Sequence, residues 1–275
     1  MSWLAKRYAI SVLPSVGSLK ALKKLDAPQQ AKQPFIGFGD PLLDGVEGDL
    51  SEARMARLLQ RGAVAEVDEV RRLPRLADTA VELESIAASL KSGPDSIYLR
   101  QEATETRVKS MDLSRYRVVA FATHGLMAGS FKGLGEPALV LTPPELGSEA
   151  DDGLLTASEI TQLKLDADWV ILSACNTAGP DGTPGAEGFS GLAKAFFYAG
   201  SRSLLVSHWP VVSEAAVKLT TRMFDELAKN PSIRRAEALR RSMVTLMEDE
   251  DAKYAHPVFW APFSVVGEGG RVSID

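Results

Sequence analysis

Short runs of β-branched and aromatic residues alternate along this chain with longer segments that carry apolar residues at helical spacing. The predicted strands cover Tyr8–Val12, Phe35–Phe38, Ser96–Leu99, Val118–Thr123, Ala138–Leu141, Trp169–Ser173, Ser203–Ser207 and Phe263–Val266. Several of these runs are apolar throughout, which is typical of strands that are buried on both faces. The alternation therefore predicts an α/β fold, with a mostly parallel central sheet and helices on both of its faces.

The segments between the strands carry signals for helices. One helix face is marked by apolar residues at helical spacing, namely Leu76, Ala80, Leu83, Ala87 and Leu90. The run from Thr156 to Glu159 has the pattern of a capping box, in which each of the two side chains binds the backbone N–H of the other residue. We expect a helix to begin there.

Three further helices are predicted over Gly188–Ala199, Ser213–Lys229 and Ser232–Glu248. Asn230 and Pro231 separate the last two, because proline cannot continue a helix and disfavours the helical conformation of the residue before it. We expect these two helices to form a hairpin on the sheet.

Length and composition exclude several classes of protein. The chain has 275 residues, of which 45% are apolar and 24% charged, and these values are typical of a globular domain with one sizeable core. We therefore expect residues 1–275 to form a single domain. No stretch approaches the roughly 18 consecutive apolar residues of a membrane span, and the N-terminus lacks the pattern of a secretory signal. The net charge of −5 gives no general attraction to nucleic acid, so neither a membrane nor a nucleic acid is predicted as a partner.

Cys175 is the only cysteine of the chain. A single cysteine cannot form an internal disulfide, which fits a reducing compartment, and we expect a cytoplasmic protein. The three histidines, His124, His208 and His256, lack the short local spacing of a structural zinc site. The sequence predicts no metal and no other cofactor.

A charged segment, residues 49–73, interrupts the alternation of strands and helices. Its Ser51–Leu59 part has a helical pattern, but loops rich in Gly, Asp and Pro flank it, and we expect an exposed helical insertion. Two other loops, Gly125–Pro137 and Pro143–Gly153, are long and polar. Long loops in compact domains are often functional, so both loops are candidate functional segments.

Two predicted strands run directly into polar residues. The strand that ends at Thr123 is followed by His124 and Gly125, and the strand that ends at Ser173 is followed, after one alanine, by Cys175. In a parallel sheet the carboxyl ends of the strands form one edge, and ligands bind in the crevice outside it. We therefore expect His124 and Cys175 to face each other at this edge.

A thiol beside an imidazole pairs a nucleophile with a base, which is the arrangement that acyl transfer requires. The backbone N–H groups of Gly125 and Cys175 are candidate donors to the oxyanion of such a reaction. A second interpretation stays open on the residues alone, because a lone cysteine is often a buried small side chain and a lone histidine is often structural.

Several blocks of the sequence resemble one known family. The most specific are Phe121–Leu126, Asp152–Ile160 and Leu172–Ala178. Further similar blocks are Tyr8–Ser11, Leu13–Ser15, Phe35–Pro41, Gly188–Ala193, Ala199–Ser203, Trp209–Val211 and His256–Phe263. Together they span nearly the whole chain, and they resemble the CHAT domain, a caspase-like (clan CD) cysteine peptidase family.

This resemblance implies a caspase-like three-layer α/β/α sandwich and the hydrolysis of peptide bonds in a polypeptide substrate. Carried over by position, it implies a catalytic dyad of His124 and Cys175 with Gly125 in the oxyanion site. Family members often lie behind sensor repeats, and a role in bacterial defence is an expectation at the level of the family. The chain begins almost at the first motif, whereas many members have an upstream strand and repeats, so we expect a fragment, a shortened form or one member of a split system. A sensor or repeat protein is an expected activator.

Substrate contacts are predicted from the residues around the dyad. The acidic residues Asp151, Asp152, Asp181 and Glu187 lie in the loops next to it and favour a basic side chain before the scissile bond. Trp209 follows a strand that resembles the border of the substrate groove in caspases, although a place in the core is as good an interpretation. His208 stands where the family more often has an aliphatic residue, and we place it near the cleft. The alternative function is an interaction or scaffold module of the same fold that is catalytically silent or is activated by a partner.

Overall fold

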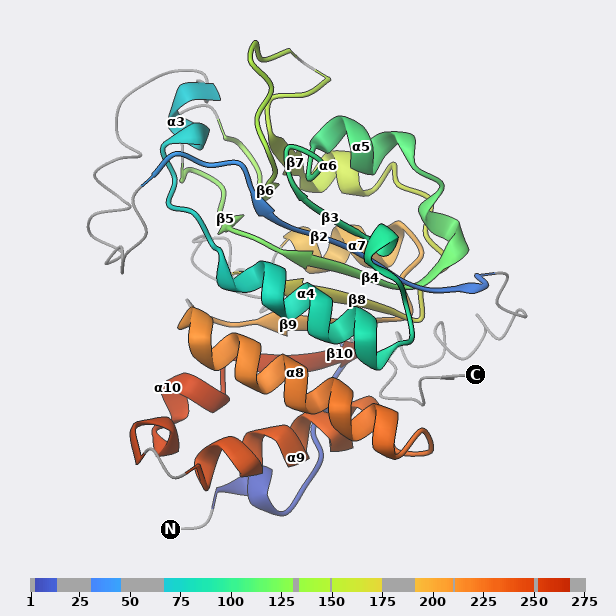
Figure 1. Ribbon diagram of the computed structural model, residues 1–275, viewed down its shortest axis with the longest axis vertical. Coiled ribbons are helices and arrows are strands. Elements are labelled where there is room, and N and C mark those ends of the chain that lie inside the picture. The colour runs from blue at the N-terminus through green and yellow to red at the C-terminus, as the bar shows by residue number, and fades with distance from the viewer. Residues whose placement is uncertain are drawn as a thin grey trace.

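A seven-stranded mixed sheet forms the centre of the protein, whose computed structural model describes residues 3–13, 31–45, 67–130, 134–148, 150–174, 191–209, 211–249 and 252–267. Its strands are β1 (Ser11–Val12), β2 (Gln33–Pro41), β3 (Ile97–Arg100), β4 (Tyr116–Ala122), β8 (Trp169–Ser173), β9 (Ser203–Ser207) and β10 (Phe263–Gly267), in the order β1-β10-β9-β8-β4-β2-β3. The five strands from β9 to β3 are parallel, whereas β10 runs antiparallel to β9 and parallel to β1. The predicted, mostly parallel sheet is confirmed (Figure 1).

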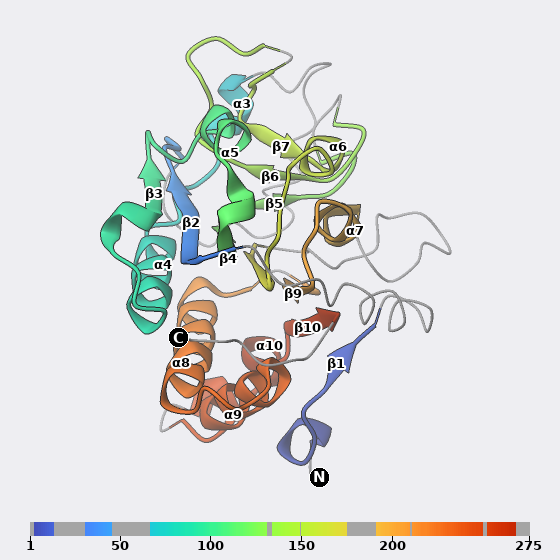
Figure 2. The same ribbon diagram turned by 90° about the vertical axis from the view of Figure 1, so that its right-hand side faces the viewer.

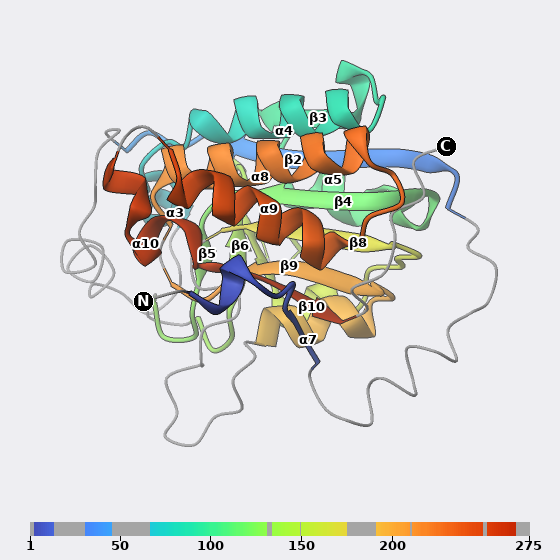
Figure 3. The ribbon, with the colours of Figure 1, turned by 90° about the horizontal axis from the view of Figure 1, so that it is seen from below.

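Helices cover both faces of this sheet, as predicted (Figures 2 and 3). One face carries α4 (Asp78–Ser89), α8 (Ser213–Lys229) and α9 (Arg235–Met247), and the other carries α5 (Glu105–Ser110), α6 (Ala157–Ile160) and α7 (Gly191–Tyr198). Side chains of β8 alternate between the two cores: Trp169 and Ile171 pack under α4 and α8, and Val170 and Leu172 pack on the opposite side. The result is the expected three-layer α/β/α sandwich.

The sequence signals for helices correspond to helices of the structure. The helix α8 has the bounds that the pattern predicts, and it pairs with α9 as a hairpin in which Ser242 Oγ donates to Leu219 O at 2.6 Å. Both hydrogen bonds of the capping box at Thr156 and Glu159 are present at the start of α6. The first strand is shorter than predicted, because only its last two residues pair with β10.

A second, smaller sheet lies beyond the carboxyl edge of the first. It consists of β5 (Gly125–Leu126), β6 (Ala138–Val140) and β7 (Leu154–Thr156), in the antiparallel order β5-β6-β7. The predicted strand at 138–141 therefore belongs to this sheet and not to the central one. The side chains of Leu126, Val140 and Leu154 form a third core cluster together with Leu43.

The predicted insertion, residues 49–73, lies mostly outside the described residues. Its described end holds α3 (Val67–Arg71), and Val70 and Leu73 are buried in the third core cluster. This end is therefore packed against the domain and not exposed as expected. The last short helix, α10 (Pro257–Trp260), begins after His256, whose Nδ1 accepts from the Val258 N–H at its N-terminus.

Short 3-10 helices complete the described structure, at Leu4–Lys6, Pro94–Ser96, Leu113–Arg115 and Ala252–Ala255. None of the helices in the described ranges is both long enough and apolar enough to cross a membrane.

Candidate active site

The chain segments that leave β4 and β8 lie side by side at the carboxyl edge of the sheet. Ala122 pairs with Ser173 in the parallel register, and the Thr123 N–H donates to Ser173 O at 3.2 Å just beyond it. The two strands are thus neighbours, and His124 follows this last hydrogen bond on the β4 side. Cys175 comes two residues after Ser173 in the sequence and lies outside the described residues.

His124 is held in one tautomer by a backbone carbonyl. The residue is only 7% exposed, and Nε2 lies 2.8 Å from the carbonyl oxygen of Pro74. Because a carbonyl oxygen can only accept, Nε2 carries the proton and Nδ1 is left with a lone pair when the ring is neutral. Burial lowers the pKa of His124 below its ordinary value of 6.5, and the bond to Pro74 offsets part of this effect. At neutral pH the ring can therefore accept a proton at Nδ1.

The Pro74 carbonyl is a functional group of this site that the sequence did not predict. Pro74 lies between α3 and α4 and forms an isolated β-bridge with Gly45. The Gly45 N–H donates to Leu73 O at 3.1 Å, which fixes the residue before the proline. A Cβ atom at Gly45 would lie 2.4 Å from the backbone oxygens of Arg72 and Leu73. Only glycine therefore lets the chain at Gly45 lie this close to the segment that leads to Pro74.

Gly125 places a backbone amide next to His124. It begins β5 and faces Leu139 of β6, and in the preceding pair the Val140 N–H donates to His124 O at 2.9 Å. Hydrogen-bonded and non-hydrogen-bonded pairs alternate along an antiparallel ladder. The Gly125 N–H therefore points away from β6, in a direction where it can donate to a group outside the sheet.

A buried carboxyl group lies beneath the end of β8. Glu82 of α4 is 1% exposed, and its Oε2 accepts from Ser173 Oγ at 2.9 Å. Its other oxygen, Oε1, is buried without a hydrogen-bond partner among the described residues. Burial raises the pKa of Glu82 to about 7, against the opposing effect of the nearby Thr220 and Ser173 hydroxyl groups. This side chain ties α4 to the strand that leads toward Cys175.

His208 and Trp209 follow β9, the next strand along the same edge. The His208 N–H donates to Pro262 O at 2.9 Å and its Nε2 lies 3.0 Å from Ser264 Oγ, so both groups bind the β10 side of the sheet. Burial lowers the pKa of His208. The Trp209 indole N–H donates to Val258 O at 3.4 Å. The described contacts of both residues are thus with the C-terminal part of the fold and do not include His124.

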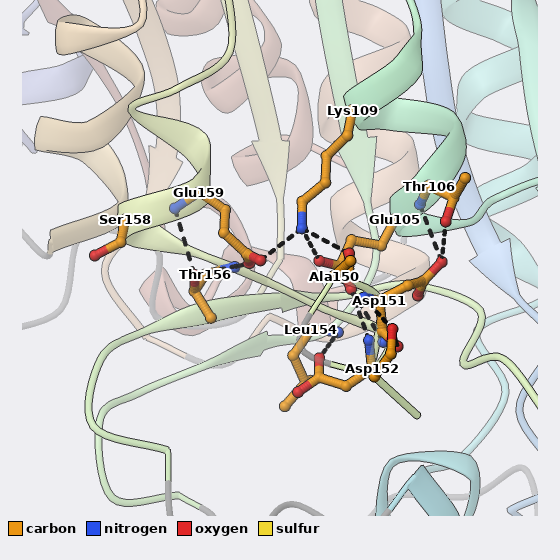
Figure 4. A network of polar contacts seen from close by, with 12 residues as sticks. Glu105, Thr106, Lys109, Ala150, Asp151, Asp152, Leu154, Thr156, Ser158 and Glu159 are labelled. Carbon is orange, nitrogen blue, oxygen red and sulfur yellow. Dashed lines mark hydrogen bonds and ion pairs between the residues drawn. The ribbon is translucent and has the colours of Figure 1, made fainter. Parts of the chain in front are cut away.

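The acidic loop before β7 makes its described contacts within the domain (Figure 4). Asp152 Oδ1 accepts from the Leu154 N–H at 3.0 Å, and Asp151 Oδ2 accepts from the N–H of Thr106 at 3.2 Å. Glu105 accepts from the N–H groups of Asp152 and Gly153, both at 3.1 Å. Asp181 and Glu187 lie outside the described residues. The preference for a basic substrate residue stays a prediction.

Within the described part of the chain, no three His, Cys, Asp or Glu side chains are grouped so that they could hold a metal ion. At the carboxyl edge of the sheet, the described residues supply two chemical groups. One is the neutral imidazole of His124 with a lone pair on Nδ1, and the other is the Gly125 N–H, which points away from β6.

Comparison with known proteins relates the chain to a family and to a fold. The family model of the CHAT domain matches residues 1–268. Tetratricopeptide repeat protein 28 of Mus musculus and that of Homo sapiens are each 27% identical to this chain over 198 aligned positions, which cover 62% of this chain and 8% of the relative. The chain thus spans less than a tenth of the length of these relatives.

Two solved structures share its architecture. The Arg-specific cysteine proteinase gingipain R of Porphyromonas gingivalis has a TM-score of 0.52 and 9% identity, over 92% of this chain and 52% of its own. A chain of the Saccharomyces cerevisiae separase–securin complex has a TM-score of 0.52 and 15% identity, over 95% of this chain and 14% of its own. At these identities the likeness concerns the fold, which is caspase-like. On the match over residues 1–268 and this fold, the chain belongs to the CHAT domain family.

Proposed function

We propose that this chain is a cysteine endopeptidase that hydrolyses peptide bonds of a protein substrate with a dyad of Cys175 and His124. The observation that carries the proposal is the state of His124, whose Nε2–H is fixed on Pro74 O while Nδ1 keeps its lone pair at the edge where β8 ends. A free thiol has a pKa of about 8.5 and is mostly protonated at neutral pH, so Cys175 needs such a proton acceptor.

In the proposed reaction, His124 Nδ1 takes the proton of the Cys175 thiol, and Sγ forms a bond to the carbonyl carbon of the scissile peptide. The C–N bond then breaks as His124 gives its proton to the leaving amine. Water attacks the resulting thioester and loses a proton to His124, the C–S bond breaks, and the departing thiolate takes that proton back from His124. The products are a carboxylic acid and the regenerated thiol, and no cofactor takes part.

Two backbone amides are proposed to bind the oxyanion that forms on the substrate carbonyl. The outward direction of the Gly125 N–H supports its part in this role. The Cys175 N–H is the second donor of the proposal. Each such donor contributes roughly 3 kcal/mol to transition-state stabilisation in acyl-transfer enzymes.

The proposed substrate is a polypeptide with Arg or Lys before the scissile bond, bound by Asp152, Asp181 and Glu187 and bordered by His208 and Trp209. A sensor or repeat protein is the proposed activator. The similarity to tetratricopeptide repeat protein 28 supports this partner class, since that name denotes a repeat protein that is much longer than this chain. The same similarity favours the second candidate function, a scaffold or interaction module of this fold without turnover.

Cleavage of a mixed fluorogenic peptide library by the purified full chain tests the proposal. The wild type, Cys175→Ala and His124→Ala are compared, and mass spectrometry locates each cut bond. We expect cleavage after Arg or Lys by the wild type and its loss in both variants. Cleavage after Asp alone would contradict the acidic pocket, and no cleavage by a folded wild type would favour the scaffold module.

A further inference from the structure

Asp40 is a buried carboxylate at the carboxyl end of β2, on the same edge of the sheet as His124. Its side chain is 2% exposed, and two arginines hold it. Arg75 binds it through both oxygens, with Nε at 3.0 Å from Oδ1 and Nη2 at 2.8 Å from Oδ2, and Arg100 Nη1 lies 3.1 Å from Oδ1. A buried charge is costly unless it is paired, and the two-point arginine contact also fixes the orientation of the pair.

The backbone around Asp40 is shaped to aim this carboxylate. The register between β2 and β3 shifts between Gly39 and Pro41, so Asp40 occupies a β-bulge. Asp40 and Arg100 have φ angles of 37° and 51°, in the left-handed region that non-glycine residues rarely adopt. Strained conformations of this kind persist where the surroundings fix them, and bulges often re-aim a side chain beside an active site.

Asp40 holds the segment that carries the Pro74 carbonyl from two sides. Arg75, the partner of its carboxylate, directly follows Pro74, so the Pro74 carbonyl belongs to the peptide group that enters Arg75. The Asp40 N–H donates to Thr79 Oγ1 at 2.9 Å, and the same hydroxyl donates to Leu76 O at 2.7 Å. The chain from Pro74 to Leu76 is thereby fixed at both ends.

We propose that Asp40 is a positioning residue for His124, which acts by fixing Arg75 and hence the Pro74 carbonyl that accepts from His124 Nε2. The inference rests on the proposed peptidase function for its catalytic consequence. Its structural consequence, the tautomer and orientation of the His124 ring, stands without that function. If Asp40 loses its charge, the Arg75 clamp loosens and the Pro74 carbonyl no longer selects the Nε2–H tautomer as strongly.

The test uses Asp40→Asn in the full chain, with Asp166→Asn as the matched control. Asp166 accepts from Arg202 Nη2 at 2.7 Å and is also partly buried, but it precedes β8 and therefore lies toward the opposite edge of the sheet. Both variants lose a carboxylate that pairs with an arginine. Arg75→Lys serves as a milder second variant, because it keeps the charge and loses the two-point contact.

Nitrogen NMR of ¹⁵N-histidine-labelled protein reports the tautomer of each of the three rings. We expect wild type and Asp166→Asn to show His124 as the Nε2–H tautomer, and Asp40→Asn and Arg75→Lys to show a mixture of tautomers. With peptides that the wild type cleaves, we expect Asp40→Asn to lower kcat by about 10- to 100-fold, because His124 is misplaced. The KM should stay within about twofold of the wild-type value.

An unchanged His124 spectrum in folded Asp40→Asn overturns the proposal, as does an equal change in Asp166→Asn. If Asp40→Asn does not fold, Arg75→Lys decides on the same criterion. If the wild type cleaves no peptide, the proposed peptidase function is contradicted but the role of Asp40 is not. The NMR measurement still tests whether Asp40 positions the His124 ring.

Discussion

At the scale of single residues, Glu82 makes the stability of this protein depend on pH. Burial raises its pKa to about 7 from an ordinary value of 4.5, so the folded state binds this proton more tightly than the unfolded state. The contribution to the free energy of unfolding is therefore fully present below pH 4.5 and is lost as the pH rises to about 7. At neutral pH the buried carboxyl group destabilises the fold.

Replacing Glu82 by glutamine removes this titration and keeps an acceptor for Ser173. We expect Glu82→Gln to be more stable than wild type at pH 8 by about 1 to 3 kcal/mol, and to lose the part of the pH dependence between 4.5 and 7 that Glu82 causes. Urea unfolding at pH 5, 6, 7 and 8 measures both effects. Parallel curves for wild type and variant across this range would contradict the assignment.

The sequence pointed to candidate site residues by their side-chain chemistry, and it gave no sign of the Pro74 carbonyl or of Asp40, which are proposed to act through the backbone or over long distances. His124 and Cys175 were predicted because imidazole and thiol groups follow strands, and their joint role stays a prediction. The Pro74 carbonyl leaves no signal in the sequence, because every residue has a backbone carbonyl. Asp40 was missed because its partners Arg75 and Arg100 lie 35 and 60 positions away, and only the folded chain brings them together.

At the scale of elements, the capping box is the feature that makes the short helix α6 begin at a fixed residue. Thr156 Oγ1 accepts from the Glu159 N–H and the Thr156 N–H donates to Glu159 Oε2. We expect Thr156→Ala to lower the free energy of unfolding by about 1 kcal/mol, whereas Thr156→Ser keeps most of the cap. Chemical denaturation of the three proteins tests this, and an unchanged stability of Thr156→Ala would show that the cap contributes nothing.

Lys109 joins three elements through one ammonium group (Figure 4). It pairs with the buried Glu105 of its own helix and with Glu159 of α6 at 2.5 Å, and it donates to Ala150 O at 2.9 Å. Burial raises the pKa of Glu105 to about 7 although Lys109 opposes the shift. Removal of the cation leaves this carboxyl group buried without a counter-charge.

We expect Lys109→Met to lower the free energy of unfolding at pH 8 by about 3 kcal/mol, the usual cost of breaking a buried ion pair on one side. The double variant Lys109→Met with Glu105→Gln should recover part of this loss, because the uncompensated charge is then gone. Thermal unfolding at pH 8 gives both numbers. Equal losses in the single and double variants would mean that the lysine stabilises by packing alone.

The elements that the sequence predicted best are the long or fully apolar ones. The bounds of α8 and the central strands β8 and β9 were correct, because their patterns extend over whole elements. The strands β5 and β7 were missed, since two or three residues are too few to show an alternation of period two. Their pairing with β6 comes from the small core cluster around Leu126 and Leu154, which depends on the tertiary fold.

At the scale of the whole molecule, the parallel sheet gathers residues that are far apart in the sequence at one edge. Four neighbouring strands each carry a polar residue at or just after the carboxyl end. These are Asp40 at β2, His124 at β4, Ser173 at β8 and Ser207 at β9. The sequence predicted this edge because parallel strands share their direction. It predicted the strand β10 but neither the antiparallel direction of that strand nor its pairing with β1, since the order of strands in a sheet is set by packing between distant segments.

The chemical reactivity of Cys175 tests the central claim most directly, because it is the only thiol in the chain. Wild type and His124→Ala are each treated with a peptidyl acyloxymethyl ketone that carries Arg or Lys and, separately, with iodoacetamide, and adduct formation is followed by mass spectrometry. The account predicts that the peptidyl reagent labels wild-type Cys175 about 100-fold faster than the variant. The rate with iodoacetamide, which needs no substrate groove, should differ much less. Equal rates of peptidyl labelling in the two proteins would contradict a dyad of His124 and Cys175.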